Sequence, residues 1–244
     1  MRRMIKPGKA LRALFILLVL LISSCRTNSG LISKNPQSSA SYTIEKIDLT
    51  EADLQLLTNA PDFTPLYPKT FTKKSGAELV INTTPFKKDG SPVGLVIYKG
   101  KVLQPAVKKY AAFAFFKDAS GSGYKAEIFD SQTELFEKYG EAQLPELAMG
   151  GFWTILRDGK EYEFIDHKDF RTAVGICDGG KTLLILVGKK LSYGDCAKIF
   201  KEAGAEVAME FDGGRSAQMV ISGKNTLPGL RRKVPLVLGF KTGF

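Results

Sequence analysis

The chain has 244 residues and a formal net charge of +10 at pH 7, with 35 lysines and arginines against 25 aspartates and glutamates. Five of the positive charges lie in the first 12 residues, which contain no acidic side chain, so a chain without this segment carries a net charge of about +5. The other basic residues are mostly scattered pairs, which argues against a nucleic acid as partner. A single histidine beside three cysteines excludes the usual zinc sites built from cysteine and histidine.

The N-terminus has the three parts of a secretory signal. Its basic start is followed by an apolar run over residues 13–22, too short to span a bilayer, and then by Ser23, Ser24 and Cys25. The four residues from Ile22 to Cys25 resemble a bacterial lipobox, in which cleavage leaves a lipidated cysteine as the new N-terminus. An uncleaved signal anchor, or an ordinary signal cut nearby, is the alternative. We therefore predict a signal peptide over 1–24 and a bacterial lipoprotein, acylated at Cys25 (for example with palmitate) and held by the membrane of the cell envelope, outside the cytoplasm.

A polar segment separates this signal from the rest of the chain. Residues 26–41 are rich in Ser and Asn, with a glycine and few apolar side chains, so 25–41 is predicted to be the lipidated cysteine and a flexible tether. From residue 42 onward the sequence shows no second linker and no convincing internal repeat. We expect 42–244 to be one domain, since about 200 residues are enough to bury a substantial core.

Three segments carry the start signal of a helix. Residues 50–53 and 131–134 each resemble a capping box, and Gly140 can end the second helix in a left-handed cap. The clearest helix begins at Ser192 and is ended by Gly204. Its apolar face, with the spacing of a helix that packs on a core, consists of Cys196, Ile199, Phe200 and Ala203.

Short apolar segments between these helices predict strands. They cover residues 78–82, 93–98, 111–116, 124–129, 152–156, 161–165, 172–177, 182–187 and 207–211. Hairpin turns separate several of them, at 117–123, 158–159 and 178–180. Many strands and few helices favour an α+β fold of mixed, largely antiparallel sheets. In this fold we expect Phe113, Phe115 and Phe116 to pack in the core.

Two cysteines remain besides Cys25. A disulfide between Cys177 and Cys196 is permitted outside the cytoplasm. However, Cys196 lies on an apolar helix face and Cys177 ends an apolar strand, which favours two small buried thiols. The bonded alternative stays open on the sequence alone.

The most suggestive acidic pattern follows the last predicted helix. Side chains of a strand alternate between its faces, so Glu210 and Asp212 should point away from the core-facing residues of 207–211. Two close carboxylates raise the pKa of one of them, so that one can donate a proton while the other stays ionised. The turn at Gly213 and Gly214 lets backbone N–H groups approach an anion. An acidic strand end that runs into a turn explains the same spacing.

Three other polar side chains lie near predicted strand ends. Arg171 precedes a strand, and its guanidinium suits bidentate phosphate binding, although a surface ion pair is the commoner use of a lone arginine. His167 lies in a polar turn and is the residue that a Ser-His-Asp site would need, but no nucleophile elbow accompanies it. Asn82 ends a strand and is able to hydrogen-bond a sugar hydroxyl or to cap the following turn.

Four segments, in this order, resemble the phosphodiester glycosidase family over roughly residue 42 to the C-terminus. They read INTTPF at 81–86, SPVGL at 91–95 with KGK at 99–101, RTAVGI at 171–176 with DG at 178–179, and DGGRS at 212–216. The resemblance implies that Asn82, Arg171, Asp212 and Ser216 line one pocket. It implies that Arg171 holds a phosphate and that Asp212 is a candidate acid or base. Asn82 and Ser216 would orient the sugar or the phosphate.

Two positions depart from the family pattern. Glu210 stands where members often have Asn, and Arg215 stands where they often have Gly. The first change adds a negative charge beside Asp212, and the second adds a positive charge to the turn. Either change is able to retune the choice of substrate or to mark the loss of the ancestral activity.

The resemblance implies a hydrolase that cleaves the glycosidic bond of a sugar-1-phosphodiester at the cell envelope. Asp212, Glu210 and Arg171 would carry the reaction, with Arg171 neutralising the phosphate. The substrate would be bound by Asn82, Gly213, Gly214, Arg215 and Ser216. The alternatives are a non-catalytic lipoprotein that binds anionic glycans or phosphopolymers through the same pocket, and a structural lipoprotein with no ligand. The sequence shows no cofactor motif or metal cluster, although a pocket carboxylate can recruit calcium without leaving a motif.

Replacing Cys25 by Ser is expected to abolish acylation, because the thiol that accepts the lipid is lost. Growth with labelled palmitate should mark the wild-type chain and leave Cys25→Ser unmarked. Cys177→Ser is the matched control and should stay labelled. A Cys25→Ser chain that still takes up the label would contradict the predicted anchor.

Overall fold

The computed structural model describes residues 37–39, 41–119, 121–165, 167–228 and 232–243. The predicted signal peptide, Cys25 and most of the predicted tether lie outside these residues. All the described residues fall within one compact unit, in agreement with the predicted single domain. In this part of the chain no helix has the length and apolar character needed to cross a membrane.

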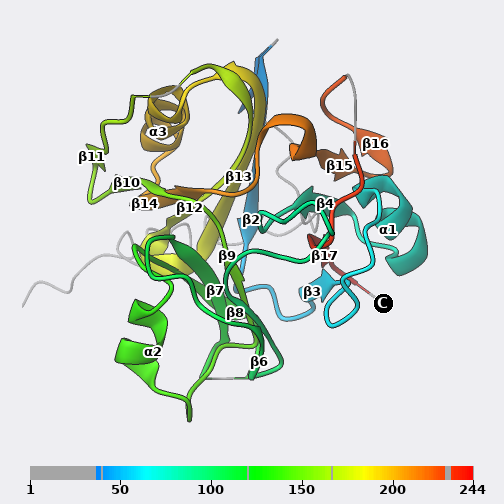
Figure 1. Cartoon of the computed structure of the whole chain (residues 1–244), viewed down its shortest axis with the longest axis vertical. Helices are drawn as coiled ribbons and strands as arrows, with labels where there is room; N and C mark the ends of the chain where they lie inside the picture. Colours follow the sequence, from blue (N-terminus) through cyan, green and yellow to red (C-terminus); the bar gives the residue numbers. More distant parts are fainter. Residues whose placement is uncertain (1–36, 40, 120, 166, 229–231, 244) are drawn as a thin grey trace, which may run out of the picture. The chain divides into compact units, whose positions relative to one another are not determined.

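The described strands form three antiparallel sheets (Figure 1). The first has seven strands, in the spatial order β1 (Gln37–Ser38), β2 (Tyr42–Asp48), β13 (Thr182–Leu191), β12 (Asp169–Cys177), β14 (Val207–Glu210), β10 (Thr154–Arg157) and β11 (Lys160–Glu161). The second has five, namely β16 (Lys224–Asn225), β15 (Met219–Ile221), β4 (Leu79–Asn82), β17 (Val237–Lys241) and β3 (Gln55–Thr58). The third also has five, namely β6 (Lys101–Gln104), β5 (Val96–Tyr98), β9 (Leu147–Gly150), β7 (Ala112–Lys117) and β8 (Tyr124–Phe129). These sheets confirm the predicted α+β class.

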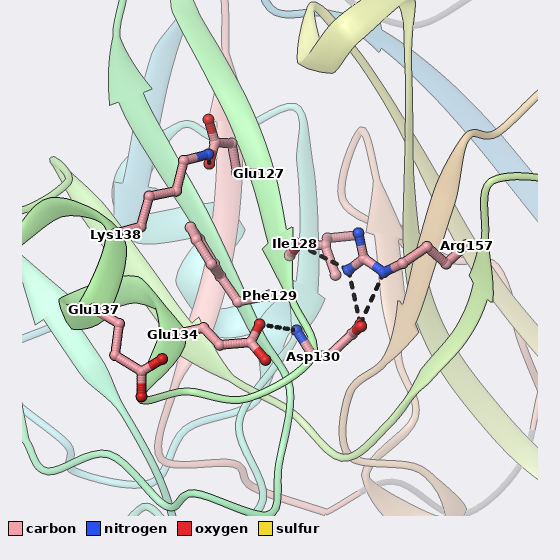
Figure 2. A pocket seen from close by; sticks show the side chains of 8 residues that line it. All are labelled: Glu127, Ile128, Phe129, Asp130, Glu134, Glu137, Lys138 and Arg157. Atoms are coloured by element: carbon pink, nitrogen blue, oxygen red, sulfur yellow. Dashed lines mark hydrogen bonds and ion pairs between the residues drawn. The ribbon is translucent and has the colours of Figure 1, made fainter.

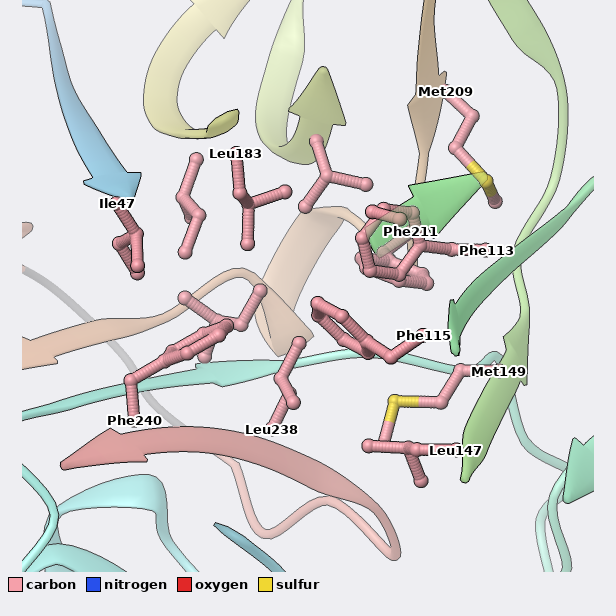
Figure 3. Packing of buried hydrophobic residues seen from close by; sticks show 14 of the residues in the cluster. Ile47, Phe113, Phe115, Leu147, Met149, Leu183, Met209, Phe211, Leu238 and Phe240 are labelled. Carbon is pink, nitrogen blue, oxygen red and sulfur yellow. The ribbon is translucent and has the colours of Figure 1, made fainter. Parts of the chain in front are cut away.

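One hydrophobic core lies between the inner faces of the three sheets (Figure 3). Met209 of the first sheet, Phe240 of the second and Phe113 of the third all belong to it and are almost fully buried. The rings of Phe113 and Phe115 meet edge to face with centroids 4.7 Å apart, an arrangement favoured by the ring quadrupoles. The prediction that Phe113 and Phe115 are core residues is therefore confirmed. Burial of each such side chain contributes roughly 2 kcal/mol.

A single helix packs on the outer face of each sheet (Figure 1). Helix α3 (Tyr193–Glu202) covers the first sheet, α1 (Pro68–Ser75) the second and α2 (Glu134–Tyr139) the third. The buried side chains that make these contacts include Phe200, Phe71 and Leu135, respectively. Each sheet is therefore apolar on both faces, which explains why its strands show near-continuous apolar runs.

The helix signals of the sequence have different outcomes. The capping box of α3 is confirmed, since the Ser192 hydroxyl accepts from the Asp195 N–H at 3.0 Å and the Asp195 carboxylate accepts from the Ser192 N–H at 2.9 Å. Helix α2 is confirmed in position, although Gly140 (φ 64°, ψ −170°) lies outside the left-handed helical region that we predicted. The predicted helix at 50–53 is wrong, because the Asp48 carboxylate binds the N–H and hydroxyl of Thr50 and holds a turn there.

Most predicted strands coincide with observed ones, with three differences. Residues 162–165 are not a strand, because β11 ends at Glu161, and Tyr162 and Ile165 are exposed. The end of the predicted tether pairs with β2 as β1. Seven further described strands and helix α1 had no prediction at all; the strands are β2, β3, β6, β9, β15, β16 and β17.

Both cysteines of the domain are free thiols and buried, as the apolar positions predict. Burial raises the pKa of the Cys177 thiol to about 11. Burial also raises the pKa of Cys196 well above its ordinary value, helped by the charge of Glu210. Neither thiol is therefore ionised near neutral pH, which makes both of them unreactive packing residues.

Glu45 is a carboxylic acid on the core-facing side of β2. It pairs with Ile185 of β13 and lies on the same face of β2 as Ile47, which belongs to the main core. The side chain is 2% exposed, and its Oε2 has no hydrogen-bond partner among the described residues. Burial raises the pKa of Glu45 from 4.5 to about 7. The charged form is therefore destabilising to the fold.

Glu45→Gln is expected to stabilise the protein above pH 7. Between pH 4.5 and about 7 the folded state keeps a proton that the unfolded state has lost, so the stability of the wild type falls as the pH rises through this window. The interval corresponds to about 3 kcal/mol at most. Urea unfolding at pH 5 and pH 8 should show this loss in the wild type and in an exposed control, Glu51→Gln, but not in Glu45→Gln. An equal pH dependence in all three proteins would refute the role of Glu45.

Candidate functional site

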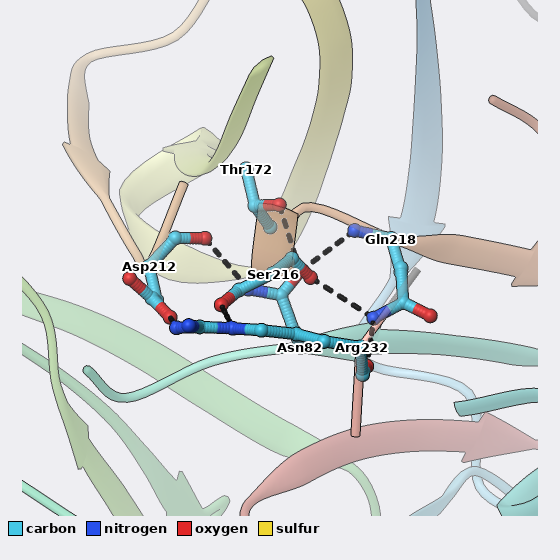
Figure 4. Close-up of polar contacts among 6 residues, drawn as sticks. All are labelled: Asn82, Thr172, Asp212, Ser216, Gln218 and Arg232. Carbon is cyan, nitrogen blue, oxygen red and sulfur yellow. Dashed lines mark hydrogen bonds and ion pairs between the residues drawn. The ribbon is translucent and has the colours of Figure 1, made fainter. Parts of the chain in front are cut away.

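Asp212 lies two residues after the end of β14 (Figure 4), and its backbone is hydrogen-bonded on both sides to the end of β4. The Asn82 side-chain amide donates to the carbonyl of Asp212 at 2.6 Å, and the Asp212 N–H donates to the carbonyl of Thr83 at 2.8 Å. The preceding Phe211 N–H donates to the carbonyl of Thr172 at 2.8 Å. The carboxyl group of Asp212 therefore extends from a backbone with little freedom to move.

Asn82 is the centre of this network. The side chain is fully buried, and its Oδ1 accepts from the Thr172 hydroxyl at 2.8 Å and from the Gln218 N–H at 2.9 Å. Leaving a buried amide without partners costs about 1–3 kcal/mol, so these bonds hold the segments together. We predicted that Asn82 orients a ligand. Because Asn82 lies behind Asp212 with no exposed surface, it is placed to act on a ligand through Asp212.

Arg232 reaches the same point from the segment before β17. Its Nε donates to the Ser216 hydroxyl at 2.7 Å, and its Nη2 lies 3.4 Å from the Asp212 Oδ2. The guanidinium also lies over the ring of Phe86, 4.3 Å from the centroid. The Arg232 side chain is 44% exposed and that of Asp212 is 15% exposed. Both charged groups are thus in reach of a ligand.

Ser216 links the two charged groups. It belongs to a short 3-10 turn, Gly214–Ser216, and is fully buried. Its hydroxyl hydrogen-bonds Asp212 and accepts from Arg232. Since Ser216 has no exposed surface, it sets the position of Asp212 and Arg232 relative to each other.

The pKa of Asp212 is raised above its ordinary value. Burial is the larger cause, and the hydrogen bond from Ser216 and the charge of Arg232 work against it. A carboxyl group that keeps its proton to higher pH, is fixed in place and is partly exposed is suited to general acid or base chemistry.

The glycines of the turn allow it to pack against the start of β12. A Cβ on Gly213 would lie 2.8 Å from the carbonyl oxygen of Phe170 and 3.9 Å from Cδ of Arg171. Gly214 has φ +57°, in the left-handed region. The backbone of β12 and the turn are thus in direct contact, which only glycine permits at position 213.

Arg171 adjoins this cluster from the side of α3. It is buried, and its Nε and Nη2 donate to the carbonyls of Leu191 at 3.1 Å and His167 at 2.7 Å. The guanidinium lies over the ring of Tyr193 at 4.0 Å. The next residue, Thr172, faces Asn82 on the other side of the sheet. The structure therefore places Asn82, Asp212 and Ser216 close together, with the aliphatic stem of Arg171 next to Gly213 and its guanidinium turned towards Tyr193. That these four residues line one pocket stays a prediction.

Glu210 has different surroundings from Asp212. It pairs with Ala173 of β12 and is 1% exposed. Its carboxylate lies beside the Cys196 thiol of α3, whose pKa it raises by its charge and a hydrogen bond. The pKa of Asp212, by contrast, is set chiefly by burial, Ser216 and Arg232. A catalytic pair of Glu210 with Asp212 stays a prediction.

The remaining predicted residues lie at the surface. Arg215 is exposed on the turn that carries Ser216. His167 is exposed, with Nε2 3.7 Å from Asp169 Oδ2. No group of acidic, histidine and cysteine side chains suited to a metal ion occurs among the described residues.

Sequence reasoning missed Arg232. Arg232 lies in a run of three basic residues at 231–233, and nothing in the sequence distinguishes it from its basic neighbours. Its partner Ser216 is 16 residues away, and the bond depends on the path of the chain between β16 and β17. No periodicity or spacing rule covers such a contact.

A row of partly exposed aromatic rings adjoins the site on the first sheet. Ring centroids are 5.3 Å apart between Tyr110 and Trp153, 6.5 Å between Trp153 and Phe164, and 5.2 Å between Phe164 and Tyr193. Tyr193 is the residue on which Arg171 stacks. The Glu210 N–H donates to the carbonyl of Trp153 at 2.9 Å, which places the row at the strand end that leads to Asp212.

A separate cleft of about 520 Å³ lies between α2 and β8 (Figure 2). Its acidic side chains are held by neighbours within the cleft: Lys138 binds Glu127 at 2.8 Å, and Arg157 binds Asp130 at 2.7 Å. These ion pairs fasten α2 and β10 to β8. We assign no reaction to this cleft.

The cluster around Asp212 falls inside a region with a known sequence pattern. The pattern of the family described as phosphodiester glycosidase matches residues 75–241, which include Asn82, Arg171, Asp212, Ser216 and Arg232. The chain belongs to the phosphodiester glycosidase family. A search of curated protein sequences finds no match.

Solved structures share the fold of this phosphodiester glycosidase domain. The zebrafish N-acetylglucosamine-1-phosphodiester alpha-N-acetylglucosaminidase catalytic domain, auto-inhibited by its pro-peptide, matches with a TM-score of 0.63 and 18% identity, covering 88% of this chain and 84% of that one. A hypothetical protein from Synechocystis matches with a TM-score of 0.57 and 13% identity, covering 85% of this chain and 61% of that one. At these identities the likeness establishes the fold.

Gly213→Ala is expected to destabilise the phosphodiester glycosidase domain by about 1–3 kcal/mol, since its Cβ would press on the Phe170 carbonyl and displace backbone. Gly194→Ala is the matched control, because its Cβ would meet only the Ser192 hydroxyl at 3.7 Å, an ordinary contact on a helix. Urea unfolding should show a loss for the first variant and none for the second. Equal stability of Gly213→Ala and the wild type would show that the turn can move away from β12.

Proposed function

We propose that this lipid-anchored protein hydrolyses a sugar-1-phosphodiester at the bacterial cell envelope, cleaving the glycosidic C–O bond. The observation that carries the proposal is the Asp212 carboxyl group, which is partly exposed, fixed by Asn82 and Thr83, and raised in pKa. Arg232 lies beside the Asp212 carboxyl group and the stem of Arg171 contacts the same turn, so positive charge is close to a bound phosphate. Membership of the phosphodiester glycosidase family supports the same reaction class.

Asp212 acts as the general acid in this reaction. As the bond from the anomeric carbon to the bridging oxygen breaks, the electron pair stays on the oxygen, and the phosphate group would change from one negative charge to two. A proton from Asp212 to that oxygen offsets the second charge. Water adds to the oxocarbenium-like carbon and releases its proton, which gives a free sugar and a phosphomonoester. A raised pKa keeps Asp212 protonated in a larger fraction of molecules near neutral pH.

Arg171 and Arg215 act on the phosphate in different ways, because the first is buried and the second is exposed. Arg171 is buried, so its charge stabilises the developing anion across the Gly213 turn. Glu210, buried beside Cys196, changes the electrostatic potential at the end of β14. Arg215 is exposed on the turn and is placed to meet the group attached to the phosphate.

A non-catalytic glycan-binding module is the second candidate. The row of aromatic rings from Tyr110 to Tyr193 favours it, because partly exposed rings can stack on the C–H faces of sugars. Such a module would bind its ligand around Asp212 and Arg232 without turnover. The two candidates differ in whether replacing the Asp212 carboxyl group by an amide abolishes turnover, because a binding module has no turnover to lose.

Asp212→Asn is expected to lose about 10²-fold or more in turnover, because an amide cannot donate a proton to the leaving oxygen. The purified protein is incubated with a panel of sugar-1-phosphodiesters, and the release of reducing sugar is followed with time. Arg171→Gln should also lose turnover, and the exposed Glu137→Gln is the control that should keep it. A folded wild-type protein that binds a glycan of the panel and releases no sugar would decide for the binding module.

The pH dependence of the reaction follows from the sign of the Asp212 shift. An acid catalyst is active in its protonated form, so the rate should fall as the pH rises through the raised pKa of Asp212. The control variant Glu137→Gln should show the same dependence of rate on pH as the wild type. A rate that instead falls on acidification would assign Asp212 the role of a base.

A further inference from the structure

Arg232 uses one edge of its guanidinium within the protein. An arginine has five N–H donors, and the described contacts use the Nε donor to Ser216 and one Nη2 donor towards Asp212. The side chain is 44% exposed, so the opposite edge of the group faces the surroundings. That edge has the fork geometry that matches two oxygens of a phosphate or sulfate.

The direction of this edge is fixed from three sides. Phe86 lies under the plane of the guanidinium at 4.3 Å. The Gln218 side chain, which is 2% exposed, donates to the backbone carbonyls of both Ser216 and Arg232, at 3.2 and 2.9 Å. The backbone of Arg232 is therefore tied to the same turn that its side chain contacts. An anion-binding group held in this way loses little conformational entropy when it binds.

We propose that Arg232 binds the phosphate group of the substrate through its exposed edge while it keeps its contact with Ser216, so that the bound anion and Asp212 share one positive charge. The proposal deepens the proposed function in naming the phosphate of a phosphodiester, and its anion-binding part holds for any tetrahedral oxyanion. Arg232 is thereby a binding residue that also adjusts the acid.

Anion binding is coupled to protonation of Asp212. In the empty site Arg232 opposes the effect of burial on Asp212. A second anion on the same guanidinium repels the Asp212 carboxylate and takes up part of the charge that stabilised it, so the neutral acid is favoured. The other charged groups near the turn, among the described residues, are Arg171 beside Gly213, Asp169 beside Gly214, the exposed Arg215 and the buried Glu210. The substrate therefore brings Asp212 into the form that the reaction needs.

This coupling is reciprocal by thermodynamic linkage. If an anion promotes protonation of Asp212, protonation of Asp212 must tighten anion binding by the same factor. Sulfate is the suitable probe, because its own charge is constant above pH 3 whereas that of phosphate is not. We expect sulfate to bind about tenfold more weakly once Asp212 is ionised, which corresponds to a coupling of about 1.4 kcal/mol.

The test is a sulfate titration of the purified full chain by calorimetry over a range of pH, with the Asp212 carboxyl followed by carbon-13 NMR. In the wild type, sulfate should raise the pKa of Asp212, and its affinity should fall as the pH rises. Arg232→Gln should bind sulfate at least tenfold more weakly and lose the effect on Asp212. Lys233→Gln removes an equal charge from the next residue, which is exposed, and is the control that should behave as the wild type.

A second variant guards against a folding defect. Arg232→Lys keeps the charge and loses the fork, so it should fold, bind sulfate with intermediate affinity and retain the pH dependence. Sulfate affinity that is unchanged in Arg232→Gln, or an Asp212 pKa that does not respond to sulfate in the wild type, would overturn the proposal. Neither measurement needs a hydrolysable substrate, so a failure here is distinct from a failure of the proposed hydrolysis. Where turnover is found, the alkaline limit of kcat should lie at higher pH than that of kcat/KM, since kcat reports the substrate-bound acid.

Discussion

The side-chain amide of Asn82 is the contact on which the site depends. It joins three segments that are far apart in the chain, through Thr172, Gln218 and the carbonyl of Asp212. Because the amide is fully buried, every one of its hydrogen bonds is made in a medium where a missing partner is costly. The same hydrogen bonds of Asn82 that hold the two sheets together therefore also fix the position of Asp212. A loop on the surface would not give Asp212 this precision.

The three-sheet core explains why such a network forms at this place. Inner faces of all three sheets are filled by large apolar side chains, and one helix covers each outer face. Polar side chains are costly to bury in such a core, so most of them lie where strands end. The start of β12 and the end of β14 lie together because these strands are antiparallel neighbours, and the end of β4 faces them from the second sheet. Arg232 and Ser216 then complete the site from segments between strands.

The sequence predicts the apolar and local parts of this structure well. Strands with continuous apolar runs, such as β7, were found to within one residue at each end. The capping box of α3 was found because its signal lies within four residues. Strand β2 escaped prediction because a glutamate and two other charged residues interrupt its apolar pattern. Residues 162–165 misled us because Tyr, Phe and Ile favour strands wherever they occur. For the site, family resemblance supplied Asn82, Asp212 and Ser216, whereas Arg232 depends on a contact between segments that no pattern records. The buried environment of Glu210 was likewise invisible, since it depends on where α3 crosses the sheet.

The strand order of the second sheet has a consequence for how the domain folds. Strand β17 lies between β4 and β3, and its Val237 pairs with Asn82 itself. A growing chain therefore has to leave a gap beside β4 until residues 237–241 arrive, and pairing across such a sequence distance is slow to form. Until then the Asn82 amide lacks its neighbouring strand, and Arg232, only a few residues earlier in the chain, is absent as well. Asp212 and Arg232 are therefore expected to come together only late in folding, when the last strand of the chain has paired with β4.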